Sequence, residues 1–113
     1  MSAPAPNPAL EELVSILGEE DTRELVRSFL REFPDQLRRL AGGDREQRRL
    51  VAHSLKSSAR HMGADALARR MAALETRLST GESDVSQEDL AATVEEFEKA
   101  AGSLRPFANR PRP

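Results

Sequence analysis

The chain has 113 residues with a formal net charge of -2, and 38% of its residues are hydrophobic while 32% are charged. This length and composition predict one compact domain, and the absence of cysteine excludes disulfides, thiolate metal sites and a cysteine nucleophile. The slightly acidic balance, the lack of a membrane-spanning apolar run and the lack of a signal pattern predict a cytoplasmic protein with no nucleic-acid or membrane partner.

Proline-rich segments lie at both ends of the sequence. Residues 1–7 are rich in alanine and proline, and residues 106–113 contain three prolines together with arginine. Because proline removes a backbone donor and restricts the preceding residue, we expect a disordered N-terminal tail over 1–7 and a C-terminal tail over 106–113. The helical domain is then expected over residues 8–105.

The first predicted helix is short and spans about residues 8–17. Asn7 can cap it, Pro8 suits its first turn, and Gly18 ends it. Four apolar residues share one face of this helix, namely Leu10, Leu13, Val14 and Leu17.

The second predicted helix spans about residues 22–41, with Asp21 as its expected cap. Its apolar stripe continues in phase on both sides of Pro34, which predicts a kink at the proline rather than a break. The stripe consists of Leu25, Phe29, Phe33, Leu37 and Leu40.

The third predicted helix spans about residues 45–62. Asp44 and Gln47 have the spacing of a capping box, and Gly63 ends the helix. Helical periodicity predicts a buried stripe made of Val51, Leu55, Ser58 and Met62.

The fourth and fifth helices are expected over about residues 65–78 and from Ser86 onward, with a polar turn at 80–85 between them. Asp89, three residues after Ser86, is the expected capping partner. Both helices carry apolar stripes, formed by Leu67, Met71, Leu74 and Leu78 and by Leu90, Val94, Phe97, Ala101 and Leu104.

Four amphipathic helices with short connections predict an all-α fold. The architecture expected is an antiparallel up-down-up-down four-helix bundle, with the short N-terminal helix packed across one end as a lid. The apolar stripes amount to one bundle's core, so a monomer is expected, although the first helix could instead pair two chains.

His53 is expected on the solvent side of the third helix. Three cations, Arg49, Lys56 and Arg60, follow the same side, and Ser54 and Ser57 are small enough to let a partner approach the ring. A plain solvated face is the common explanation of such a pattern. His61 lies on the flank, and we expect it to be partly buried near the helix end.

The segment over residues 52–64, A-H-S-L-K-S-S-A-R-H-M-G-A, resembles the histidine-containing phosphotransfer (HPt) domain of bacterial multistep phosphorelays. The matching residues are His53, Leu55, Lys56 and Gly63. Leu67 and the pair Leu74–Glu75 also stand where such domains carry a Leu and a Leu-Glu, so the resemblance covers about residues 10–104. Ser57 departs from the family, which usually has Gly directly after the Lys.

This resemblance implies a phosphocarrier rather than an enzyme. His53 would accept a phosphoryl group, on the distal ring nitrogen, from an aspartyl phosphate of one receiver domain and pass it to another receiver. Lys56, Arg60 and Arg49 would stabilise the phosphoryl group or dock the receiver, while Leu55 and Gly63 would be structural. The chain would bind no cofactor or metal, since Mg²⁺ comes with the receiver, and a hybrid histidine kinase is a further expected partner.

Other functions remain open from the sequence. The main alternative is a helical scaffold that binds partners without transferring phosphate. A di-metal bundle site would need Glu-x-x-His pairs, but Leu50 and Ser58 stand three residues before the two histidines. The sequence also contains a cluster of basic residues, which comprises Arg38, Arg39, Arg45, Arg48 and Arg49. DNA binding is a poor explanation of this cluster, because the sequence shows no recognition helix. We expect the cluster to be solvated or to take part in receiver docking.

Overall fold

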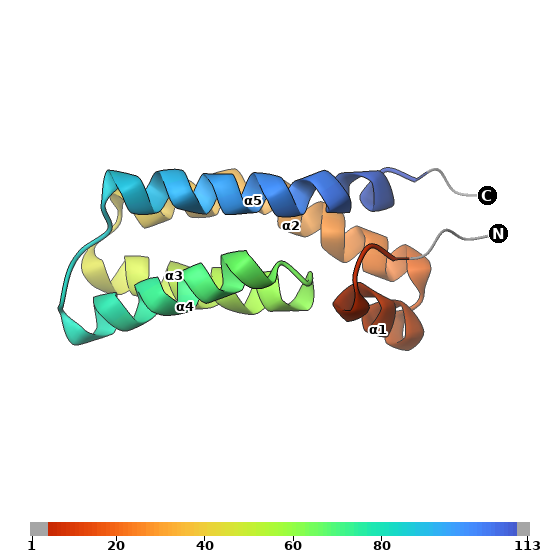
Figure 1. Ribbon diagram of the computed structural model, residues 1–113, viewed down its shortest axis with the longest axis horizontal. Helices are drawn as coiled ribbons and strands as arrows, with labels where there is room; N and C mark the ends of the chain where they lie inside the picture. The colour runs from red at the N-terminus through yellow and green to blue at the C-terminus, as the bar shows by residue number, and fades with distance from the viewer. Residues whose placement is uncertain (1–4, 111–113) are drawn as a thin grey trace.

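The computed structural model describes residues 5–110, and within these residues all regular structure is helical. Five helices follow one another along the described chain (Figure 1): α1 Pro8–Leu17, α2 Glu19–Gly42, α3 Arg45–His61, α4 Asp65–Thr80 and α5 Gln87–Ala108. None of them is both long enough and apolar enough to cross a bilayer.

Helices α2 to α5 form an antiparallel bundle, and the molecule, with α1 included, measures 50 × 20 × 18 Å (Figure 1). Each helix packs against the next, and α5 returns to pack against α2, so that α2 and α4, like α3 and α5, stand diagonally. Helix α1 lies beyond the shared end of α3 and α4 and contacts α2 and α3. The predicted all-α bundle with a short additional N-terminal helix is therefore confirmed.

Aromatic stacking joins α2 to α5 in the core. The rings of Phe33 and Phe97 are parallel with centroids 3.7 Å apart, and Phe29 lies 5.7 Å from Phe97. Leucine and methionine side chains that are almost completely buried fill the remaining space, including Leu40, Leu55, Leu67, Met71, Leu74 and Leu104. Burial of these side chains is the main stabilising contribution to the fold.

Small residues bring α3 and α4 close together, and this pair is the most closely packed in the bundle. Ala52 and Ala59 on α3 are fully buried, whereas Val51 and Ser58 are only half-buried. The predicted stripe was therefore displaced by one residue, although Leu55 and Met62 are buried as expected. A hydropathy pattern favours large apolar residues, but here the alanines face the neighbouring helix because they permit its approach.

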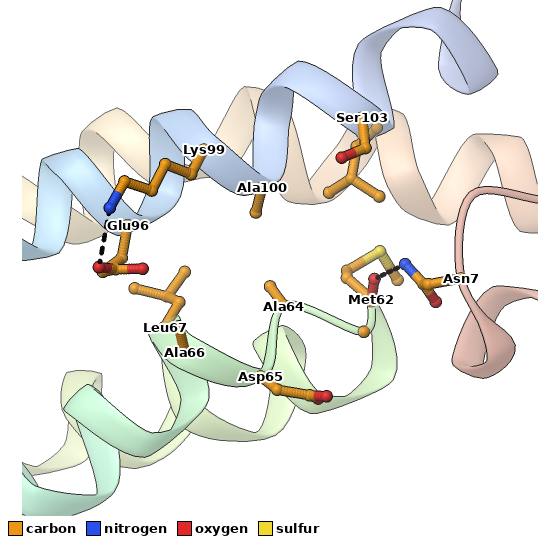
Figure 2. A pocket seen from close by; sticks show the side chains of 12 residues that line it. Asn7, Met62, Ala64, Asp65, Ala66, Leu67, Glu96, Lys99, Ala100 and Ser103 are labelled. Carbon is orange, nitrogen blue, oxygen red and sulfur yellow. Dashed lines mark hydrogen bonds and ion pairs between the residues drawn. The ribbon is translucent and has the colours of Figure 1, made fainter.

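Asn7 fastens α1 to the turn between α3 and α4. Its Oδ1 accepts a hydrogen bond from the Leu10 amide at 2.9 Å, and its Nδ2 donates to the Met62 carbonyl at 2.9 Å (Figure 2). Gly63, the next residue, has a φ of +73°, and a Cβ there would stand 2.2 Å from Asn7 Oδ1. Glycine is therefore required at this turn for both its backbone conformation and its lack of a side chain.

Helix α2 begins three residues earlier than predicted, with Gly18 and not Asp21 as its N-cap. Glu19 and Glu20 in the first turn both form ion pairs with the buried Arg23, which makes these positions helical. The helix passes through Pro34 without interruption, as the phase of the stripe predicted. Leu25, however, is exposed, while Val26 is fully buried.

Helix α5 continues to Ala108, so residues 106–108, assigned from the sequence to the C-terminal tail, are helical. Phe107 and Ala108 are buried, the Arg23 guanidinium lies 5.7 Å from the Phe107 ring centroid, and Arg27 Nε donates to the Ala108 carbonyl at 3.0 Å. These tertiary contacts outweigh the missing amide of Pro106. The outer parts of both predicted tails, 1–4 and 111–113, lie outside the described residues.

Candidate functional site

His53 lies near the middle of α3, and 56% of its side chain is exposed. The helix turns Ala52 and Leu55 into the core, which leaves His53 at the outer edge of the contact with α4. The capping box between Asp44 and Gln47, with mutual hydrogen bonds of 2.9 Å, fixes the start of this helix as predicted. The predicted exposure of His53 is confirmed.

A single carboxylate on α4 contacts both His53 and Lys56. Glu75 Oε2 lies 2.8 Å from His53 Nδ1, and Glu75 Oε1 accepts a hydrogen bond from Lys56 Nζ at 2.6 Å. The side chains of Glu75 and Lys56 are largely buried, so these contacts are shielded from water. The close approach of α3 and α4 is what brings the three groups together.

The Lys56 hydrogen bond lowers the pKa of Glu75, a second hydrogen bond from His53 acts in the same direction, and burial partly opposes both. Glu75 is therefore ionised at neutral pH and can only accept hydrogen bonds. It follows that the proton of a neutral His53 ring is on Nδ1 and that Nε2 holds the free lone pair. This tautomer is assigned from the hydrogen-bond geometry.

The three cations expected beside His53 differ in their environments. Lys56 is turned toward Glu75, and Arg49 binds Glu46 through Nε and Nη2 at 3.0 and 2.6 Å. Glu46, and at longer range Glu75, raise the pKa of Arg49. Arg60 is exposed, and no ion pair reaches it from the part of the chain that the structure describes.

The remaining predicted positions divide into surface and core. Ser54 is exposed and Ser57 is half-buried, while Leu55 is completely buried. His61 is exposed rather than partly buried, so that expectation was wrong. His61 lines an open surface hollow together with Leu13 of α1 and Met62, so that its ring stays accessible to water.

Glu75 is the site residue that sequence reasoning missed. The Leu74–Glu75 pair had been noted for its resemblance to a family, but no contact to His53 or Lys56 was inferred from it. The contact joins residues on two different helices, α3 and α4. Periodicity within one helix does not reveal which residues of another helix lie opposite.

The arginine cluster separates into groups with different roles. Arg45 donates to the carbonyls of Leu78 and Ser83 at 3.0 and 2.8 Å, and Arg48 pairs with Asp84 at 2.6 Å. These two arginines hold the turn between α4 and α5. Arg38 and Arg39 instead remain at the surface, near the end of α2.

A pocket of about 280 Å³ between the start of α4 and α5 does not include His53 (Figure 2). Ala64 and Ala100 line it from opposite sides, and Lys99 and Glu96, both on α5, form an ion pair at 3.6 Å beside it. Within residues 5–110 no group of three His, Asp or Glu side chains is arranged to hold a metal ion.

The site therefore offers an exposed imidazole whose tautomer is fixed and whose Nε2 is available as a nucleophile, with cationic groups nearby. A family model described as the Hpt domain matches residues 24–104. Neither the comparison with curated proteins nor the comparison with solved structures gives a match.

Proposed function

The chain belongs to the Hpt domain family, and from this premise we propose that it is a phosphorelay intermediate that carries a phosphoryl group on His53. Hpt domains are phosphocarriers without a catalytic site of their own, and they interact with receiver domains and kinases in phosphorelays. His53 accepts the group from an aspartyl phosphate on one receiver and returns it to an aspartate on another.

The observation that carries this proposal is the hydrogen bond between His53 Nδ1 and Glu75 in an exposed histidine. In the forward step the Nε2 lone pair forms a bond to phosphorus while the bond from phosphorus to the aspartyl oxygen breaks, and the electron pair leaves with the receiver's carboxylate. The ring then carries a positive charge, which the Glu75 carboxylate at Nδ1–H offsets. No proton has to move during the transfer.

Lys56 and Arg60 supply positive charge for the phosphoryl oxygens. Phosphoryl transfer depends on positioning and charge stabilisation rather than on further covalent chemistry. Arg60 is exposed on the same helix, and Lys56 can exchange its contact with Glu75 for a contact with the new dianion. Mg²⁺ and the acidic residues that bind it belong to the receiver, which can approach closely because Ser54 and Ser57 are small.

Replacement of His53 tests the proposal. The purified chain is incubated with a panel of phosphorylated receiver domains and Mg²⁺, and acid-labile, base-stable label on the chain is followed. We expect label on the wild type and on His61→Gln, which changes the other exposed histidine, and none on His53→Gln. Label that persists on His53→Gln, or no label on the wild type from any receiver, would overturn the proposal.

A second candidate is an interaction module that does not transfer phosphate. The observation that favours it is an exposed apolar surface on α1 and α2, where Ile16 is 67% exposed and Leu17 and Leu25 are also exposed. In that case His53→Gln would bind the partner of the wild type and would retain its cellular function, whereas a phosphocarrier would lose it.

A further inference from the structure

A hollow lies between the end of α2 and the first half of α3. Figure 1 shows these two helix segments at the end of the bundle opposite α1. The volume of the hollow is about 510 Å³. Leu50, Val51 and Gly42 line it, and Arg38 and Arg39 stand at its edge. It combines an apolar wall with a cationic rim.

Leu50 is the prominent apolar residue of this hollow, and 51% of it is exposed. It precedes His53 by three residues, so the two side chains are neighbours on the surface of α3. One helical turn rises only about 5.4 Å, so a protein large enough to cover His53 also covers Leu50. The hollow is therefore continuous with the surface around the histidine.

The charge at the rim is not balanced within the described residues. Arg38 and Arg39 both pair with Asp35, at 3.0 and 3.1 Å, so that two guanidinium groups share one carboxylate. Both arginines are well exposed. Exposed pairs of this kind contribute little to folding, so these arginines are free to exchange Asp35 for another acid.

We propose that the Leu50 hollow, defined as Leu50, Val51 and Gly42 with the rim residues Arg38 and Arg39, is a docking surface for the receiver domain that exchanges phosphate with His53. The hollow takes an apolar side chain of the receiver, and Arg38 and Arg39 pair with carboxylates beside it. An acidic partner is indicated because the rim is cationic and because the aspartyl phosphate itself lies in an acidic site. This proposal rests on the proposed function.

Three variants test the surface. Leu50→Asp removes the apolar contact, Arg39→Glu reverses the charge at the rim, and Gly42→Leu fills the hollow. A Cβ atom at Gly42 meets nothing within 4 Å, and replacement of a helical glycine favours the helix, so this variant is expected to fold. Val94→Asp on α5 and Arg69→Glu on α4 are matched controls, because both residues are exposed and lie outside the hollow.

Two readouts are compared for each variant. The first is binding of a receiver domain and transfer of phosphate from it; the second is labelling of His53 by phosphoramidate, a small donor that needs no docking. We expect the three variants to lose about tenfold or more in receiver affinity and transfer, as for central interface residues, with unchanged labelling by phosphoramidate. The controls should match the wild type in both.

The outcomes separate the two proposals. Normal receiver binding by Leu50→Asp and Gly42→Leu would overturn the docking surface, as would a parallel loss of phosphoramidate labelling, since the defect would then be at His53. A dimeric wild type that Leu50→Asp converts to a monomer would assign the hollow to a second copy and would also overturn it. If the wild type binds receivers through the hollow but accepts no label from any donor, the docking surface stands and the phosphocarrier fails.

Discussion

The Glu75 carboxylate has two tasks at once, because one oxygen contacts the histidine and the other contacts the lysine. It fixes the ring proton on Nδ1 and it holds Lys56 beside the ring. The negative charge of Glu75 has two opposite effects on a phosphoryl group bound to the ring. It repels the phosphoryl dianion, and it stabilises the positive charge of the ring. If His53 carries a phosphoryl group as proposed, the balance between these two effects would set how readily it gives the group up.

Removing Glu75 should impair the histidine as a nucleophile. We expect Glu75→Ala to slow phosphate uptake by His53 about tenfold, which corresponds to the loss of one charge-assisted hydrogen bond. The ¹⁵N chemical shifts of the His53 ring should at the same time show that the Nδ1–H tautomer is no longer dominant. Lys56→Ala is the matched control, because it should slow transfer without changing the tautomer. An unchanged tautomer in Glu75→Ala would contradict the assignment.

At the scale of helices, a helix start could be predicted from the sequence where a side chain caps it. Asp44 with Gln47 and Ser86 with Asp89 form capping boxes in the structure, because such caps depend only on residues three positions apart. The start of α2 and the end of α5 were not predicted. At the start of α2, Arg23 pairs with Glu19 and Glu20 within the first turns. At the end of α5, Phe107 and Ala108 contact Arg23 and Arg27, which are distant in the sequence.

Asn7 joins two helices, and its two functional groups can be separated by mutation. Asn7→Ala removes the cap of α1 and the bond to Met62, and should lower the free energy of unfolding by about 1–2 kcal/mol in urea denaturation. Asn7→Asp keeps the acceptor for Leu10 but lacks the donor for Met62, so its stability should be intermediate. Equal stability of Asn7→Asp and the wild type would show that the bond to Met62 contributes nothing.

A partly buried ion pair between Arg77 and Asp89 also holds the turn between α4 and α5. Arg77 donates to Asp89 at 2.6 and 3.0 Å, and the Ser86 amide adds a bond of 2.9 Å. Arg77, with the help of Ser86, holds the pKa of Asp89 well below its ordinary value of 3.8. The unfolded chain therefore binds this proton first as the pH falls, and the stability due to Asp89 is complete at neutral pH and is lost below about pH 4.

Asp89→Asn should consequently lower the free energy of unfolding by about 1–3 kcal/mol at pH 7, and the difference from the wild type should shrink at pH 3. Urea denaturation at both pH values measures this. Asp84→Asn is the control, because Asp84 pairs with Arg48 at an exposed position and should cost less than about 1 kcal/mol. A constant difference between Asp89→Asn and the wild type across this pH range would refute the assignment to the ion pair.

At the scale of the molecule, the bundle could be predicted because its helices are long, periodic and joined by short connections. His53 could be placed on the outside for the same reason. The contacts between helices could not be predicted: the alanines that bring α3 toward α4, and the Glu75 carboxylate placed between His53 and Lys56, follow from packing. The histidine was thus predictable, and the group that fixes its tautomer was not.

The expected oligomeric state remains a monomer. Light scattering after size exclusion should give a mass near 12.5 kDa that does not change with concentration. The alternative is a dimer, because an exposed apolar surface can form a dimer interface. Such a surface is formed here by Ile16, Leu17 and Leu25. A mass near twice the expected value that Ile16→Asp reduces by half would identify that interface and would contradict the prediction.

The two ends of the described chain lie at the same end of the bundle, beside α1 (Figure 1). For an engineered fusion, this makes the two termini equivalent as attachment points for a tethered receiver. His53 is near the middle of α3 in a molecule that is 50 Å long, and a flexible linker of about 20 residues has a root-mean-square span of about 25 Å. A linker of that length on either terminus should give the highest effective concentration of receiver at the histidine, and a much shorter one should leave the two domains unable to meet.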